Sequence, residues 1–123
     1  MISFDGFSAE NNVPIYLQII SYIKRGIVSG VIADGDEMPS RRTLSALLGV
    51  NPNTVQKAYR MLEEEGLIRS HAGAKSYMVL EGGTVARIRA ELLEEDAREA
   101  VNKLRQMGVS MEEAIGLIRK YWN

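Results

Sequence analysis

The chain has 123 residues, and 46% of them are hydrophobic, a proportion typical of a folded globular chain. Its lack of cysteine excludes disulfides, iron–sulfur clusters and thiolate zinc sites, and one histidine is too few for a metal site built from several histidines. The 15 Lys and Arg residues nearly cancel the 16 Asp and Glu residues, and the net charge of −1, taken as a whole-chain sum, argues against a nucleic-acid partner.

Targeting segments and catalytic motifs are not visible in the sequence. No apolar run approaches the roughly 18 residues of a membrane span, and residues 1–12 lack the basic and apolar regions of a secretory signal. We therefore expect a cytoplasmic protein without a membrane partner. Because no nucleophile–base pair, metal-ligand cluster or phosphate-binding glycine loop is present, the sequence predicts neither an enzyme nor a bound metal or cofactor.

The N-terminal part of the chain predicts a flexible arm followed by one helix. Residues 1–12 are mostly polar, which favours a poorly ordered segment. Pro14 suits the first turn of a helix, where a backbone N–H has no partner, and Gly30 is a typical stop. Between them, apolar residues recur at spacings of three and four, as on one buried helix face: Tyr16, Ile19, Ile20, Ile23 and Ile27.

Two short helices are predicted next. Ser40 is a good N-cap for a helix over residues 41–48, and Gly49 suits its end. Asn51 and Pro52 then provide the cap and the first position of a second helix. Two short helices joined by a glycine-containing turn are typical of a helix-turn-helix. The apolar residues that we expect to face inward are Leu44, Leu47, Leu48, Val55, Ala58, Tyr59 and Leu62.

Two short strands should follow these helices. Residues 67–70 and 76–80 are predicted to be strands, joined by a turn around Gly73. A β-hairpin directly after a helix-turn-helix forms a winged helix, so we expect residues 13–81 to be one winged helix-turn-helix domain. The predicted fold class is mostly α with a small β-hairpin.

The tail, residues 82–123, begins with the expected hinge Gly82-Gly83 and contains two predicted helices. The first spans about residues 84–107 with apolar residues at heptad spacing, and Ser110 opens a capping box for the second. Two amphipathic helices alone cannot bury such broad apolar stripes. We expect them to pack on a second copy of the chain, with packing on the N-terminal domain as the alternative. The expected dimer contacts are Leu93, Ala97, Ala100, Leu104, Met107, Ile115, Ile118 and Trp122.

Positive charge is concentrated in the predicted helix-turn-helix. Residues 38–62 contain no Asp or Glu but four Lys and Arg residues, a local charge of +4. Phosphate attraction depends on the facing surface rather than on the chain total. The second helix also begins with Asn and Thr side chains, and recognition helices use such N-terminal residues to contact base edges. This stretch therefore predicts a DNA-binding surface.

The segment from Pro14 to Ile68 resembles the DNA-binding domain of the GntR family of bacterial transcription regulators. The run NPNTVQKAYRMLEEEGLI and the short two-helix tail are most similar to its YtrA subfamily. The family's P-S-x-R element falls on residues 39–42, where Arg42 holds the position of the usual DNA-contacting arginine, and the recognition helix starts at residues 51–54. The predicted DNA-binding residues are Ser40, Arg41, Arg42, Asn51, Pro52, Asn53, Thr54, Gln56, Lys57, Arg60, His71, Gly73 and Lys75.

The predicted wing matches the family's R-G-x-G-T-F pattern only in part. Gly73 and Ser76 match its first glycine and its threonine, whereas Ala72 and Lys75 replace its arginine and its second glycine. The lost arginine weakens an expected minor-groove contact, for which His71 and Lys75 could substitute.

Together the residues and the resemblance predict a homodimeric transcription regulator, a repressor, on a palindromic double-stranded DNA operator. The resemblance implies control of a neighbouring transporter operon. An unidentified small-molecule effector could bind the tail and change the separation of the two winged domains. The alternative is a winged-helix protein-interaction module that does not bind DNA, which the acid-free cationic stretch disfavours.

Overall fold

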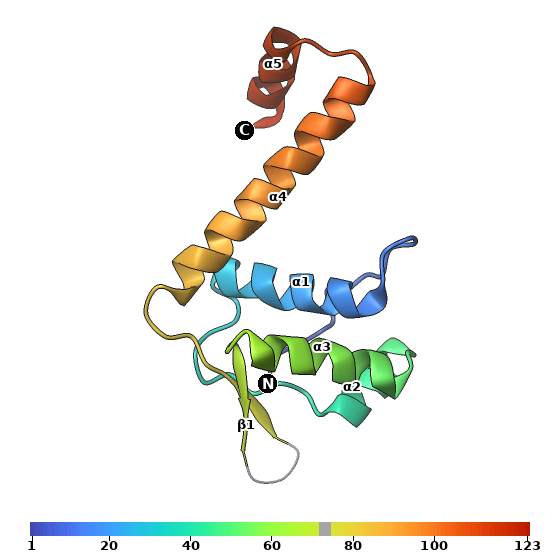
Figure 1. Ribbon diagram of the computed structural model, residues 1–123, viewed down its shortest axis with the longest axis vertical. Helices are drawn as coiled ribbons and strands as arrows, with labels where there is room; N and C mark the ends of the chain where they lie inside the picture. Colours follow the sequence, from blue (N-terminus) through green and yellow to red (C-terminus); the bar gives the residue numbers. More distant parts are fainter. Residues whose placement is uncertain (72–74) are drawn as a thin grey trace. The chain divides into compact units, whose positions relative to one another are not determined.

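The computed structural model describes residues 1–71 and 75–123, and within them the elements follow the predicted order (Figure 1). These elements are α1 (Ile15–Ser29), α2 (Arg41–Leu48), α3 (Pro52–Glu64), β1 (Ile68–Ser70), β2 (Ser76–Met78), α4 (Thr84–Gln106) and α5 (Met111–Tyr121). The fold class is the predicted one, mostly α with a small antiparallel hairpin. The chain divides into two compact units, Met1–Ile88 and Arg89–Asn123.

Helices α1 and α3 lie side by side at the centre of the first unit, and α2 packs against α3 (Figure 1). Both central helices turn an apolar stripe inward, because burying such a stripe stabilises an amphipathic helix more than its intrinsic propensity does. The buried residues of the three helices are Ile19, Ile20, Ile23, Ile27, Leu44, Ser45, Val55, Ala58, Tyr59 and Leu62. The expectation for Leu47 is wrong: this side chain is 60% exposed, because α2 buries only the side that carries Leu44.

The hairpin closes the first unit beside α3. Strands β1 and β2 pair antiparallel, with Ile68 opposite Met78, and each strand is shorter than the sequence predicts. Ile68 and Met78 are both buried, so this cross-strand pair anchors the hairpin to the core. The loop before α2 is attached to β2, because the Met38 amide donates to the Ser76 carbonyl over 2.9 Å. The hairpin and the start of α2 are therefore linked through the backbone.

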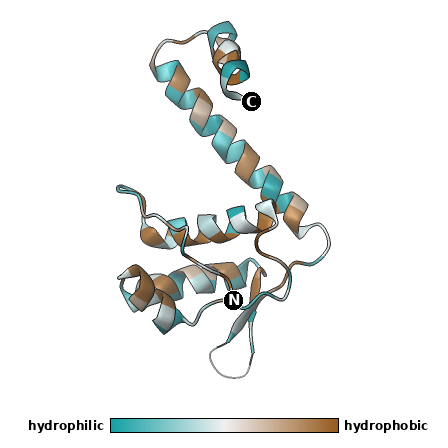
Figure 2. Ribbon diagram, turned by 180° about the vertical axis from the view of Figure 1, so that it is seen from behind, coloured by the Kyte–Doolittle hydropathy of each residue, from teal (hydrophilic) through white to brown (hydrophobic). Residues whose placement is uncertain are grey.

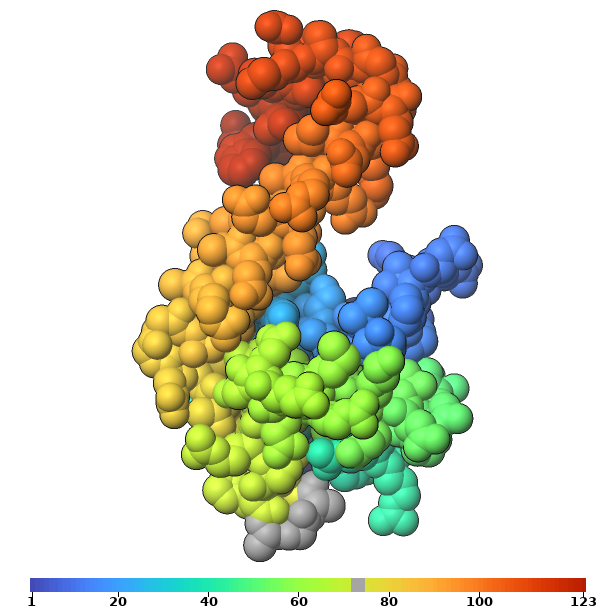
Figure 3. All heavy atoms as spheres, viewed as in Figure 1, coloured from blue at the N-terminus to red at the C-terminus, as the bar shows by residue number. Residues whose placement is uncertain are grey.

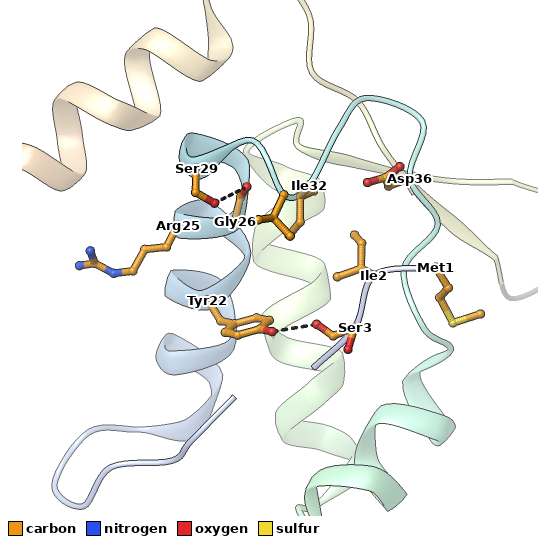
Figure 4. Close-up of a pocket in the computed structure, with 10 residues that line it drawn as sticks. Met1, Ile2, Ser3, Tyr22, Arg25, Gly26, Ser29, Ile32 and Asp36 are labelled. Carbon is orange, nitrogen blue, oxygen red and sulfur yellow. Dashed lines mark hydrogen bonds between the residues drawn. The ribbon is translucent and has the colours of Figure 1, made fainter. Parts of the chain in front are cut away.

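The first residues of the chain differ from the flexible arm that the sequence predicts. Ile2 and Phe4 are buried, and the Ile2 amide donates to the Glu37 carbonyl over 2.9 Å. The Phe4 ring stacks on Tyr22 of α1 with 4.8 Å between ring centroids, and the Tyr22 hydroxyl donates to the Ser3 carbonyl over 2.8 Å (Figure 4). An open pocket of about 670 Å³ lies between this segment and α1. The segment is docked because its few apolar residues find partners on α1.

The second unit contains most of α4 and all of α5. Hydrophobic residues recur along both helices, as the brown segments in Figure 2 show. Ser110 caps α5 by accepting a hydrogen bond from the Glu113 amide over 3.2 Å, which confirms the predicted capping box start. Because the first unit ends at Ile88, the expected hinge Gly82-Gly83 lies inside that unit. Among the described residues, no helix is long and apolar enough to cross a membrane.

Candidate nucleic-acid interface

The N-terminal end of α2 presents two adjacent arginines. Ser40 caps this helix: its Oγ accepts a hydrogen bond from the Thr43 amide over 3.1 Å and donates one to Thr43 Oγ1 over 2.7 Å. The cap starts the helix at Arg41, so Arg41 and Arg42 occupy a first turn that contains no acidic residue. Arg42 is exposed, and within the described part of the chain no hydrogen bond or ion pair holds it. Its charge is therefore available to a phosphate.

Arg41 is held in place by α3. Its guanidinium carbon lies 5.0 Å from the centroid of the Tyr59 ring, a cation–π arrangement. Tyr59 is buried, and its hydroxyl donates a hydrogen bond to the Pro39 carbonyl over 2.6 Å. Burial raises the pKa of the Tyr59 hydroxyl, and the nearby Arg41 charge opposes this rise less strongly. The hydroxyl therefore remains protonated and continues to donate at neutral pH.

The N-terminal half of α3 exposes polar side chains. Asn51 is extended and caps the helix, because its Oδ1 accepts a hydrogen bond from the Asn53 amide over 2.8 Å. The side chains of Pro52, Asn53 and Gln56 are exposed, and Thr54 is half-buried. They lie away from the buried stripe of α3, as the 3.6-residue helical period requires. In Figure 3 the spheres of α3 lie between those of α2 and those of the hairpin.

The two cations of α3 already have partners within the protein. Lys57 Nζ lies 4.0 Å from the centroid of the Tyr16 ring on α1. Arg60 Nε lies 3.9 Å from Glu64 Oε1, and the two side chains are 58% and 69% exposed. An exposed cation–π contact contributes about 0.5–1 kcal/mol, and an exposed helical ion pair about 0.3–0.5 kcal/mol. Both contacts are weak enough for a DNA phosphate to replace them.

Two of the three predicted wing residues lie within the described residues. His71 and Lys75 are both exposed, and the His71 amide donates to the Lys75 carbonyl over 2.9 Å at the end of the hairpin. The His71 ring meets Tyr77 edge-on, with 5.2 Å between ring centroids. Gly73 lies outside the described residues. In the part of the chain that the structure describes, no cluster of His, Asp and Glu is placed to hold a metal ion.

Several contacts that support this surface are not predicted by the sequence. Lys24 of α1 forms an ion pair with Glu65 at the end of α3 over 3.0 Å, and the Lys24 side chain is only 15% exposed. Tyr16 is predicted as an inward-facing residue, and Tyr59 as a core residue or a phosphate contact; neither prediction includes the contact that each makes with a cation of the candidate interface. These partners are far apart in the chain, so no local pattern connects them.

The predicted dimer contacts lie in the second unit, where most of them are exposed. Met107 and Trp122 are 72% and 80% exposed, and no residue of α5, all of which is described, is buried. A groove of about 520 Å³ lies between α4 and α5. Most of the predicted contacts line this groove, namely Ala97, Ala100, Leu104, Ile115 and Ile118, whereas Leu93, Met107 and Trp122 do not. The second unit therefore leaves a contiguous apolar surface exposed to solvent.

Comparison with known proteins agrees with this geometry. The family described as "Bacterial regulatory proteins, gntR family" matches residues 15–77, which run from α1 into β2. The chain is 33% identical over 104 residues to the HTH-type transcriptional repressor YtrA of Bacillus subtilis, and the match covers 84% of this chain and 80% of that protein.

Solved structures give the same assignment. A GntR family transcriptional regulator from Listeria monocytogenes is 29% identical with a TM-score of 0.78, over 91% of this chain and 98% of that chain. The DNA-binding domain of AraR in complex with operator ORX1 is 28% identical with a TM-score of 0.51, over 64% of this chain and 95% of that chain. The chain therefore belongs to the gntR family of bacterial regulatory proteins, and it is a transcription regulator with a DNA-binding domain rather than an enzyme.

Proposed function

We propose that this regulator binds a palindromic DNA operator as a homodimer and represses transcription. The observation that carries the proposal is the position of Arg41 and Arg42 at the start of α2, next to the polar N-terminal half of α3, in the acid-free stretch 38–62. A surface of this kind attracts phosphates and presents hydrogen-bonding groups to bases. Repression is supported by the relative YtrA, which is named as a repressor.

In the proposed complex, α3 lies in the major groove of the DNA. Phosphate contacts fix the position of a protein on the duplex, whereas contacts to base edges determine its sequence preference. We assign phosphate contacts to Arg41, Arg42 and Lys57, and base contacts to Asn53, Thr54 and Gln56. Because Asn51 Oδ1 already caps α3, Asn51 contributes chiefly by holding the helix start in place.

A homodimer explains the exposed apolar surface of the second unit. Leu104 is half-buried while Met107 and Ile118 are exposed, and a second copy of α4 and α5 would remove such side chains from water. Two-fold symmetry then predicts two half-sites about 34 Å apart, one turn of the DNA helix, or a multiple of that distance.

Selection of DNA from a pool of random duplexes tests the DNA-binding proposal. We expect the enriched sequences to contain an inverted repeat and to be retarded in a gel by the wild-type protein. Arg42→Ala should weaken binding to all duplexes, whereas Gln56→Ala should relax the preference at one base position by about 1–3 kcal/mol. Lys103→Ala is a matched control, because Lys103 is an exposed cation of α4 that pairs with Glu99.

A failure of the selection would favour the second candidate function. If the wild-type protein retards no duplex at low salt, the winged-helix domain is a protein-interaction module and the DNA-binding proposal is wrong. Uniform weakening by Gln56→Ala across all sequences would instead make Gln56 a phosphate contact.

The oligomeric state tests the role of the second unit. Ile118→Glu places a charge on the apolar surface of α5 and should convert a dimer into a monomer in light scattering. Gln106→Glu adds the same charge at an exposed polar position of α4 and should leave the dimer intact. A wild-type protein that is monomeric at all concentrations would contradict the homodimer.

We also propose that a small apolar effector binds across the dimer, in the part of the groove of about 520 Å³ between α4 and α5 that the second copy leaves open; the lining of this groove is mostly apolar. Such a compound should raise the melting temperature and change the affinity for DNA together. A DNA affinity that no cellular metabolite changes would contradict this proposal. Control of a transporter operon, which rests on the family resemblance, is tested by mapping the binding sites on the genome.

A further inference from the structure

We infer that Tyr59 is a positioning residue for DNA binding, which holds Arg41 and the start of α2 in the orientation that meets a phosphate. This inference rests on the proposed DNA-binding function and adds a role for a buried residue. Tyr59 is buried, so it would act through Arg41 and the backbone rather than by touching DNA.

The first part of the argument is the hydroxyl of Tyr59. It donates a hydrogen bond of 2.6 Å to the carbonyl of Pro39, the residue directly before the cap Ser40. The bond is buried and joins residues 20 positions apart in the chain. A buried hydrogen bond of this length fixes the backbone, because a buried carbonyl left without a donor would destabilise the fold. The start of α2 is thereby attached directly to α3.

The second part of the argument is the ring of Tyr59. The Arg41 guanidinium lies over this ring at 5.0 Å, and Arg41 Nε is buried and lacks a hydrogen-bond partner in the described residues. Arg41 also stands in the first turn of α2, where the helix dipole disfavours a positive charge. The ring therefore holds a cation at a position that is unfavourable until an anion arrives. A phosphate at the helix N-terminus would satisfy both the charge and the dipole.

The neighbouring Arg42 lacks the support that the Tyr59 ring gives to Arg41. Arg42 is exposed, and no described partner holds it, so it must lose more conformational entropy when it contacts DNA. Arg41 has part of its freedom removed before binding. The two adjacent cations should therefore respond differently to a change at Tyr59.

A double-mutant cycle between Tyr59 and Arg41 tests the inference. The probe is a duplex enriched by the wild-type protein from a random pool, and affinities are measured at a temperature where every variant is folded. Tyr59→Phe should weaken binding about twofold to tenfold, the range of one net hydrogen bond. Tyr59→Leu, which also removes the ring, should weaken it further. In an Arg41→Ala background both changes should have a much smaller effect.

Tyr22→Phe is the matched control. It removes a hydroxyl that also donates to a backbone carbonyl, that of Ser3, but at the N-terminal segment rather than at α2 (Figure 4). This variant should bind DNA like the wild type. Equal losses for Tyr22→Phe and Tyr59→Phe would overturn the inference, because the effect would then be one of general stability.

The salt dependence provides a readout that simple core packing would not change. Tyr59→Leu should reduce the steepness of the salt dependence by up to about 0.9 per protomer, as Arg41→Ala does, with no further reduction in the double variant. Additive losses with an unchanged slope would make Tyr59 only a core residue and would overturn the inference. If Tyr59→Leu does not fold, the Tyr59→Phe cycle still decides. Failure of the wild type to bind any duplex would instead refute the proposed function.

Discussion

Raising the salt concentration should weaken DNA binding by an amount that the structure limits on both sides. Each neutralised phosphate contributes about −0.9 to the slope of log K against log salt concentration. Arg41 and Arg42 have no acidic partner in the described residues, whereas Lys57 and Arg60 must first leave Tyr16 and Glu64. Contacts by the two arginines of α2 alone give a slope of about −1.8 per protomer, and contacts by all four cations give about −3.6.

A dimer on two half-sites doubles these values to between about −3.6 and −7.2. Between about 50 and 200 mM salt, the affinity should therefore fall by between about 10² and 10⁴. Fluorescence anisotropy of a labelled duplex enriched from a random pool measures this change directly. A whole-protein slope weaker than about −1 would refute the reasoning, because it would mean that these cations do not face phosphates.

The variant Arg42→Ala tests the contribution of a single cation to this salt dependence. It should reduce the steepness of the slope by about 0.9 per protomer, because Arg42 is exposed and makes no described ion pair that its removal would disturb. Arg60→Ala should reduce it less, since it also leaves the Glu64 carboxylate without its partner near the DNA. An Arg42→Ala slope equal to that of the wild type would assign Arg42 a role other than phosphate contact.

Three further predictions concern stability, each measured by urea unfolding. Burial raises the folded-state pKa of Tyr59 above its unfolded value of about 10, so the stability that its neutral form contributes is complete below pH 10 and is lost as the pH rises further. The difference in free energy of unfolding between the wild type and Tyr59→Phe should therefore narrow by about 1.4 kcal/mol from neutral pH to pH 11. A difference that does not change with pH would contradict this prediction. Ser40→Ala should cost about 1 kcal/mol through the lost cap, and an unchanged free energy of unfolding would mean that the cap is not needed. Ile2→Ala should cost about 2 kcal/mol because Ile2 is buried, whereas a flexible N-terminal arm would show no loss.

The starts of the helices were predictable because a helix cap is a local interaction. Ser40, Asn51 and Ser110 each accept a hydrogen bond from an amide two or three residues further along the chain, so the residue type and its neighbours suffice. The exposure of Leu47 was not predictable in this way. Helix α2 is short and contains several closely spaced leucines, and it cannot bury all of them against one partner. Only the tertiary packing determines that Leu44 is the leucine that becomes fully buried.

The contacts that organise the candidate interface depend on residues distant in the chain. The Tyr59 hydroxyl meets Pro39 across 20 positions, and Lys24 meets Glu65 across 41. The sequence identifies which side chains are cationic, but it does not show which of them are restrained. The same limit applies to the N-terminal segment, where Ile2 is buried through its contact with the region before α2 and not through any pattern of its own.

The net charge of −1 is compatible with DNA binding because the cations and the acids occupy different parts of the chain. The acids of α3 begin only at Glu63, in the last turn of the helix, and Glu65 at its end pairs with Lys24. The low total charge nevertheless limits long-range attraction to any polyanion. With two to four cations per protomer, phosphate contacts from a single protomer would support only weak binding. Tight and selective binding then requires a second half-site and contacts to bases. The proposal therefore needs both the apolar surface of the second unit, which would hold the dimer together, and the Asn53 and Gln56 side chains, which would contact the bases.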